Sequence, residues 1–123
     1  MIYKNSQLKS ADNSGAKKIK CISIFRKSTG SLGDIIYVII QKINIRKKLL
    51  KKKLYKALLI GTKCRKKRLN HHFIKFKNNR VLLLDEKFKF LGTRVYGPIS
   101  KEVRYCLKSS RYKKIISYSQ GTV

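Results

Sequence analysis

The chain has 123 residues, of which 32 are Lys or Arg and 5 are Asp or Glu, so its formal net charge at pH 7 is +27. Self-repulsion at this charge opposes a compact free monomer, which indicates a polyanionic partner: RNA or DNA first, an anionic membrane second. A hydrophobic fraction of 42% excludes a fully disordered chain, and the length predicts one domain over residues 1–123.

The cysteines and the apolar runs exclude further classes of protein. Cys21, Cys64 and Cys106 are odd in number and widely spaced, so they predict free, mostly buried thiols rather than a disulfide framework or a Cys-x-x-Cys metal site. The longest apolar run, residues 35–40, is far shorter than the roughly 20 residues of a membrane-spanning helix. Residues 1–8 lack the apolar centre of a signal peptide, so we expect no cleaved leader.

The first predicted element is a β-hairpin over Leu8–Phe25. Its turn, Asp12-Asn13-Ser14-Gly15, combines side chains that bind nearby backbone with a glycine that accepts a positive φ. The residues that follow alternate and are often β-branched, which is typical of a strand. The turn also offers backbone N–H groups beside lysines, a surface suited to phosphate.

The middle of the chain gives one clear strand and one ambiguous segment. After a two-glycine loop at residues 28–34, the run at residues 35–40 is apolar on both faces and predicts a central or barrel-wall strand. Leucines spaced by four in residues 46–60 fit a basic amphipathic helix, but residues 54–60 also fit a strand that follows a solvated basic loop. Periodicity alone leaves both interpretations open.

A dense cationic patch at residues 62–68 comes next. Residues 73–76 and 81–84 predict two strands joined across the turn at residues 77–80. The patch has few acids to pair with, so contact with phosphate is favoured over a plain solvated surface.

A glycine-flanked loop, residues 92–98, leads into the last part of the chain. Pro98 suits the first turn of a helix, and apolar residues at spacings of four predict a short amphipathic helix within a helical segment at about residues 98–111. Residues 114–118 predict a final short strand or extended segment.

Together these motifs resemble the family of universal large-subunit ribosomal protein number fourteen. The match rests on Leu8–Lys17, on Gly92-Thr93-Arg94-Val95-Tyr96-Gly97-Pro98 and on Glu102-x-Arg104, in the family's order nearly end to end. The resemblance implies a mainly β fold: a small five-stranded β-barrel with β-hairpin extensions and one or two short C-terminal helices. It also favours the strand interpretation of residues 54–60. The chain departs from the family at Leu69-Asn70-His71, where a Pro-Asp-Gly turn is usual.

The resemblance implies a structural constituent of the large ribosomal subunit with several partners. These are large-subunit rRNA, small-subunit rRNA across an intersubunit bridge, the neighbouring large-subunit proteins numbers three and nineteen, and a ribosome-silencing factor, with no membrane. The composition is rich in Lys, Ile, Tyr and Asn and has one proline, as an AT-rich gene encodes. We therefore expect an organellar ribosome, mitochondrial in preference to plastid, and an organelle-encoded chain.

Two sets of residues are predicted to carry this function. The rRNA-binding set combines turn residues and cations: Lys9, Asn13, Ser14, Lys17, Lys47, Lys48, Lys51, Lys52, Lys53, Lys63, Arg65, Lys66, Lys67 and Arg68. The face toward the small subunit or the silencing factor comprises Thr93, Arg94, Tyr96, Lys101, Arg104 and Lys113. An alternative role for Arg94 is an ion pair with Glu102 or Asp85, and Glu102 is expected to pair with Arg104 or a nearby lysine.

No enzyme is predicted. The sequence has no nucleophile–base constellation, phosphate-binding loop or dinucleotide fingerprint, and the adjacent His71 and His72 lack metal-ligand spacing, so neither cofactor nor metal is expected. Two other functions stay open: a single-strand nucleic-acid-binding OB-like module, which needs aromatic platforms on its sheet, and a cationic membrane-active or calmodulin-type helix around residues 47–60.

Overall fold

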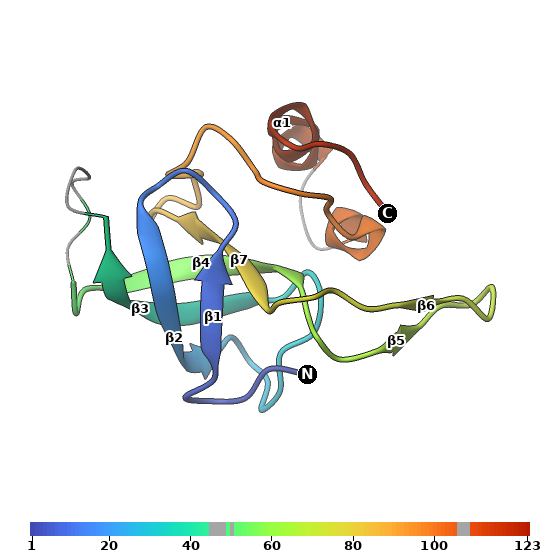
Figure 1. Ribbon diagram of the computed structural model, residues 1–123, viewed down its shortest axis with the longest axis horizontal. Helices are drawn as coiled ribbons and strands as arrows, with labels where there is room; N and C mark the ends of the chain where they lie inside the picture. Colours follow the sequence, from blue (N-terminus) through green and yellow to red (C-terminus); the bar gives the residue numbers. More distant parts are fainter. Residues whose placement is uncertain (45–48, 50, 106–108) are drawn as a thin grey trace.

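The structure is a computed structural model that describes residues 1–44, 49, 51–105 and 109–123. Five strands close into a barrel in the order β1 (Gln7–Ser10), β2 (Ala16–Ile24), β3 (Ile35–Ile43), β4 (Leu54–Gly61) and β7 (Arg80–Leu84) (Figure 1). Neighbours are antiparallel except β1 and β7, which run parallel and close the barrel. The predicted mainly β fold with a five-stranded barrel is confirmed.

The predicted N-terminal hairpin is present as β1 and β2, with Leu8 opposite Ile19. Gly15 in the connecting turn has a φ of 102°, in the region that favours glycine, so the turn chemistry inferred from the sequence is correct. In the segment that allowed two interpretations, residues 54–61 form strand β4, and the strand interpretation is confirmed. Residues 45–48 and 50 lie outside the described part of the chain.

Both faces of β4 and β7 are buried, which explains their continuous apolar runs. Alternate side chains of the two strands join the barrel interior: Ala57, Leu59, Val81 and Leu83. The side chains between them pack outside the barrel against the C-terminal segment in a second core: Leu58, Ile60, Leu82 and Leu84 with Ile99, Val103 and Ile115. This second core fixes the C-terminal helices against the barrel wall.

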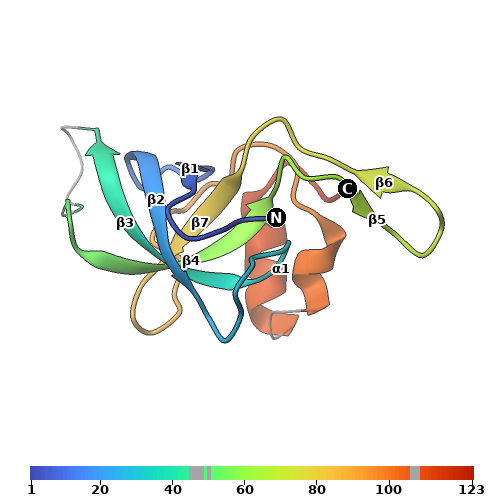
Figure 2. The same ribbon diagram turned by 90° about the horizontal axis from the view of Figure 1, so that it is seen from below.

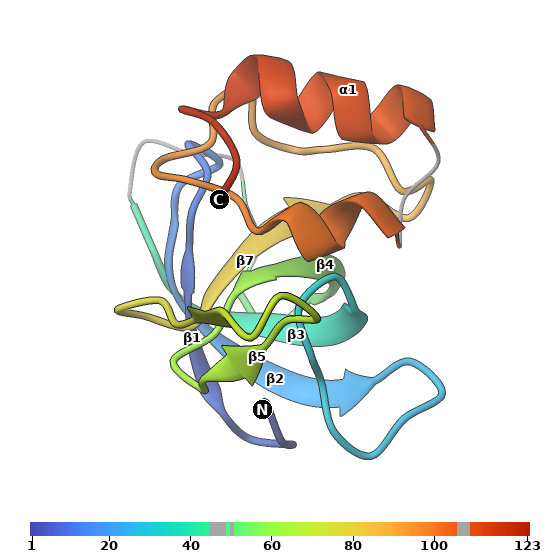
Figure 3. The same ribbon diagram turned by 90° about the vertical axis from the view of Figure 1, so that its right-hand side faces the viewer.

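The C-terminal segment forms two short helices, the 3₁₀ helix η1 (Lys101–Tyr105) and the α-helix α1 (Ser109–Tyr118). They lie side by side over β4 and β7 (Figure 3). A two-stranded ribbon of β5 (Lys66–Lys67) and β6 (Phe73–Ile74) projects from one end of the barrel (Figures 1 and 2). Within the described residues, no helix has the length and apolar character needed to cross a membrane.

Two sequence-based predictions in this region are wrong and one is correct in part. Strands are present at residues 73–74 and 80–84, as predicted, but residues 75–76 lie outside the first strand, which pairs with β5. Residues 114–118 belong to α1 and do not form the predicted final strand. Ile115 is buried and Ile116 is 37% exposed, so the two adjacent isoleucines lie on different faces of a helix. Pro98 precedes the helices instead of starting one, and the helical segment spans residues 101–105 and 109–118 instead of 98–111.

The thiols match the sequence-based prediction in part. Cys21 is free and buried in the barrel, as expected, whereas Cys64 is free but exposed at the base of the ribbon. Cys106 lies outside the described residues.

Candidate nucleic-acid and subunit interface

The ribbon carries part of the predicted cationic patch away from the barrel. Arg65 and Lys67 are exposed and Lys66 is half-buried. The Arg65 guanidinium lies 4.5 Å from the centroid of the Phe73 ring, which is 53% exposed, so a cation–π contact orients this arginine. At the ribbon's tip the Arg68 N–H donates to the His72 carbonyl at 2.8 Å, and His71 has a φ of 60°.

Arg68 differs from the other cations of the patch because its charge is neutralised within the protein. Its Nε donates to Glu102 Oε1 at 2.6 Å, and its Nη2 donates to Glu102 Oε2 at 3.0 Å and to the Val123 carbonyl at 2.7 Å. This bidentate pair ties the ribbon to η1 and to the end of the chain. The prediction that Glu102 pairs with Arg104 or a lysine is wrong, because its partner is Arg68.

The pKa of Glu102 lies below its ordinary value. Burial of the side chain opposes ionisation, but the hydrogen bond from Arg68 and the positive charges of Arg68 and Lys66 together outweigh it. Arg68 in turn has a raised pKa because the hydrogen bond to Glu102 favours its charged form. The pair is therefore fully ionised at neutral pH.

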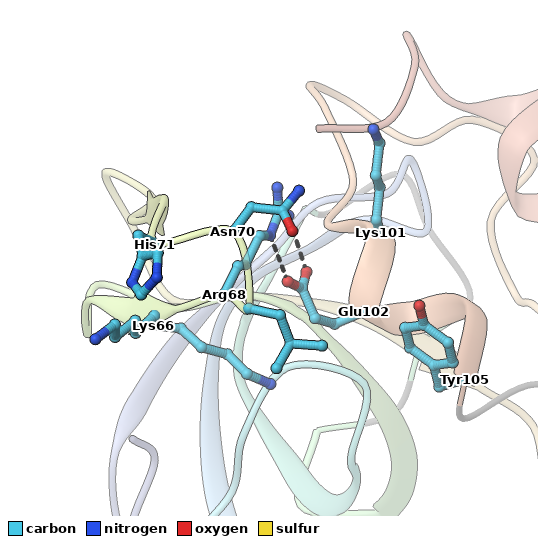
Figure 4. A pocket seen from close by; sticks show the side chains of 9 residues that line it. Lys66, Arg68, Asn70, His71, Lys101, Glu102 and Tyr105 are labelled. Carbon is cyan, nitrogen blue, oxygen red and sulfur yellow. Dashed lines mark hydrogen bonds and ion pairs between the residues drawn. The ribbon is translucent and has the colours of Figure 1, made fainter.

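A cleft of about 710 Å³ separates the ribbon from η1 (Figure 4). Lys66 and His71 line it on the ribbon side, whereas Lys101 and Tyr105 line it on the η1 side. The Arg68–Glu102 pair lies between the two walls and joins them.

Side chains of the β1–β2 turn form hydrogen bonds with other parts of the protein, which the sequence did not indicate. Asn13 Nδ2 donates to the Thr93 hydroxyl at 2.9 Å, and Asn13 Oδ1 accepts from the backbone N–H groups of Thr93 at 2.8 Å and Arg94 at 3.2 Å. The Ser14 side chain is buried and its hydroxyl donates to Asp12. Asn13 therefore positions the loop that follows Gly92, whereas Ser14 binds within its own turn. Contact of these two residues with phosphate stays a prediction.

Asp12 joins this turn to the barrel. Its Oδ2 accepts from the Leu83 N–H at 3.1 Å, and its Oδ1 accepts from the Ser14 N–H at 3.3 Å and from the Ser10 hydroxyl. Gly92 packs against this turn so closely that a Cβ atom there would lie 2.8 Å from Asp12 Cβ. The fixed geometry of the loop thus needs both the acid and the glycine.

Arg80 is a site residue that the sequence analysis missed. Its Nη1 donates to the Tyr96 carbonyl at 2.9 Å, its Nη2 donates to the Pro98 carbonyl, and its guanidinium lies 4.9 Å from the Phe76 ring centroid. Burial lowers the pKa of this guanidinium. Arg80 stands at the start of β7, and no sequence signal connects it to a loop 16 residues later, so only the fold reveals this role.

The contacts of Asn13 and Arg80 thus fix the conformation of the loop that is predicted to face the small subunit. Thr93, Arg94 and Tyr96 are exposed, as are Lys101, Arg104 and Lys113 on the helices. The Val95 N–H donates to the Tyr118 carbonyl at 2.9 Å, which ties the loop to the end of α1. The ion pairs between described residues are Lys27–Asp34 and Arg68–Glu102, so Arg94 pairs with neither Glu102 nor Asp85.

A groove of about 460 Å³ runs between α1 and the segment before the loop. Four cations that the sequence analysis did not select line it together with Thr93: Lys87, Lys89, Arg111 and Lys114. The Arg111 guanidinium lies 5.5 Å from the Phe88 ring centroid, which holds this cation at the groove. The groove extends the predicted subunit-facing surface along α1.

The remaining predicted rRNA-binding lysines are distributed over the barrel. Lys9, Lys17, Lys51, Lys52, Lys53 and Lys63 are exposed, whereas Lys47 and Lys48 lie outside the described residues. They come from β1, β2, the segment before β4 and the base of the ribbon. In the part of the chain that the structure describes, no group of three or more His, Cys, Asp or Glu side chains is placed to hold a metal ion.

Two comparisons bear on the identity of the chain. The model of the family described as ribosomal protein L14p/L23e matches residues 1–123. The large ribosomal subunit protein uL14 of Carsonella ruddii (strain PV) is 38% identical over 126 residues, an alignment that covers 100% of both chains.

Proposed function

Because the chain belongs to the ribosomal protein L14p/L23e family, we propose that it is a structural protein of the large ribosomal subunit that binds large-subunit rRNA and contributes to an intersubunit bridge. Family membership makes it a ribosomal component and not an enzyme. The location that follows is the ribosome. The sequence-based assignment to an organelle is not supported, because the relative named above is bacterial.

One observation supports RNA binding most directly: the positive charge of the chain is left almost uncompensated by its own acids. The net charge is +27, and the ion pairs within the described residues involve two carboxylates. Cations on the projecting ribbon and along the α1 groove therefore remain available to backbone phosphates, whose neutralisation releases counterions. Neighbouring proteins numbers three and nineteen and a silencing factor belong to this proposal through the family resemblance alone.

The test of rRNA binding is sedimentation of the full chain on sucrose gradients. We expect it in the large-subunit fraction, retained through a moderate salt wash. Isolated protein should also melt at a higher temperature when rRNA fragments are added, since a ligand that binds only the folded state stabilises it. A free pool in the gradient together with an unchanged melting temperature would contradict the proposal.

The bridge role is tested at Arg94. Its side chain is exposed, and its backbone N–H is held by Asn13. Arg can bind phosphate or carboxylate through two parallel hydrogen bonds and Lys cannot, so Arg94→Lys should impair joining of purified large subunits to small subunits while incorporation stays normal. Arg26→Lys is the matched control, because it makes the same change at an exposed arginine between β2 and β3 that belongs to neither predicted set. Failure of Arg94→Lys protein to incorporate would instead place Arg94 in the rRNA anchor, and normal joining would remove the loop from the bridge.

A further inference from the structure

We propose that the cleft between the ribbon and η1 binds an unpaired RNA nucleotide, whose base stacks on Tyr105 and whose flanking phosphates lie at Lys66, Lys67 and Lys101. The inference rests on the proposed RNA binding and goes further, because it names the RNA element that this cleft accepts.

Two large side chains in the cleft are exposed without a structural reason. The Tyr105 side chain is 87% exposed and Leu69 is 99% exposed, and both line the same cleft. The second core of the protein takes in Val103 from η1, so Tyr105 lies on the helix away from that core. An open aromatic face beside an aliphatic group is the surface on which a nucleobase stacks.

The charge of the cleft suits the backbone on either side of that base. Three lysines reach it from two different elements, and its one acid, Glu102, is already occupied by Arg68. An incoming phosphate therefore meets ammonium groups and no free carboxylate. Asn70 and His71 line the ribbon side of the cleft, opposite Tyr105, and add hydrogen-bond donors and acceptors there (Figure 4).

The geometry favours an unpaired nucleotide over a duplex. In a duplex the bases stack on one another and their faces are covered, so a duplex could offer the cleft only phosphates and hydroxyls. The cleft of about 710 Å³ is bounded on two sides and joined by the Arg68–Glu102 pair, which matches one splayed nucleotide better than a helix. An acidic peptide would satisfy the lysines but would leave the ring of Tyr105 unused.

The test uses the absence of tryptophan from the chain, since Tyr105→Trp then provides a single fluorescent reporter in the cleft. Titration with a single-stranded oligoribonucleotide should quench this tryptophan, and a duplex of the same sequence should bind without quenching it. Tyr3→Trp is the matched control, because Tyr3 is also well exposed but belongs to neither the ribbon nor η1. Anisotropy of labelled RNA measures binding in the same samples.

Affinity provides a second measurement that does not depend on the reporter. Tyr105→Ala should weaken single-strand binding about 5- to 100-fold, Tyr105→Phe should leave it nearly unchanged, and Tyr3→Ala should have little effect. RNA binding without quenching in the cleft, equal quenching by duplex, or quenching by an acidic peptide in place of RNA would overturn the nucleotide site while the proposed rRNA binding stands. If the unmodified chain binds no RNA, both the nucleotide site and the proposed rRNA binding are wrong.

Discussion

Replacing Asn13 with Ala is expected to release the Thr93–Arg94 loop from the β1–β2 turn. The change removes three hydrogen bonds, one from the side-chain amide and two from backbone N–H groups of the loop. Each such bond contributes about 0.5–1.5 kcal/mol net, and water can replace part of it at this half-exposed site, so the free energy of unfolding should fall by about 2 kcal/mol. Asn13→Asp keeps an acceptor for both backbone groups and should cost less than about 1 kcal/mol.

Chemical denaturation in moderate salt measures the stability, and hydrogen exchange at the amides of Thr93 and Arg94 measures the loop. We expect fast exchange at both amides in Asn13→Ala and near-normal protection in Asn13→Asp. The affinity for RNA at fixed salt should be the same in Asn13→Ala as in the unmodified protein if Asn13 acts inside the molecule; a neutral amide releases no counterion, so a direct phosphate contact would change this affinity and not its salt dependence. A weaker affinity with normal amide protection would refute this reasoning and support a contact between Asn13 and phosphate.

Three further outcomes follow from the described contacts. Replacing Lys66 and Lys67 together with Ala should flatten the slope of log affinity against log salt by about 0.7–0.9 for each phosphate that the variant no longer neutralises, whereas Arg68→Ala should mainly lower the denaturation midpoint. The Arg68–Glu102 pair stabilises the fold at pH values above the ordinary Glu pKa of 4.5, and this contribution is lost as the pH falls through the lower pKa that Glu102 has in the folded state. Acid should therefore destabilise the unmodified protein more than the Glu102→Gln variant, as measured by denaturation curves at successive pH values. Gly97→Ala should cost at least about 1–2 kcal/mol by thermal unfolding, because residue 97 has a φ of +78° and a Cβ atom there would lie 2.5 Å from a guanidinium nitrogen; an unchanged melting temperature would show that the loop relaxes freely.

The strands of the barrel could be predicted because their signals are local. The turn at Asp12–Gly15 and the apolar runs at residues 35–40 and 81–84 each specify an element through neighbouring residues alone. The ribbon could not be predicted in this way, because β5 and β6 have two residues each and pair with each other through a tip that the sequence pattern does not mark. The prediction of a strand at residues 114–118 failed because the sequence does not show which surface the segment packs against. Two adjacent isoleucines fit a strand, but in α1 only Ile115 is buried.

The candidate site shows where such local reasoning ends. Composition identified the cations of the predicted rRNA-binding set, and those that the structure describes are exposed except Lys66 and Arg68, which are half-buried. The roles of Asn13, Arg68 and Arg80 depend on partners 80, 34 and 16 residues away, respectively, which no local pattern encodes. Polar residues in a turn predict hydrogen bonding correctly, but only the fold shows whether the partner is phosphate or another segment of the same chain.

The parallel pairing of β1 with β7 also governs the order in which this protein can fold during its synthesis. Lys9 and Arg80 are register partners, so the first strand waits for its last neighbour until about 70 further residues have been made. During that interval the apolar inner faces of β2 and β3 have no closed interior, and the open edge of β1 is free to pair with other chains. Because Arg80 begins β7 and also binds the carbonyls of Tyr96 and Pro98, the same event that completes the barrel starts to order the loop at the subunit-facing surface. Closure of the barrel and ordering of the subunit-facing loop therefore depend on the same residue, Arg80.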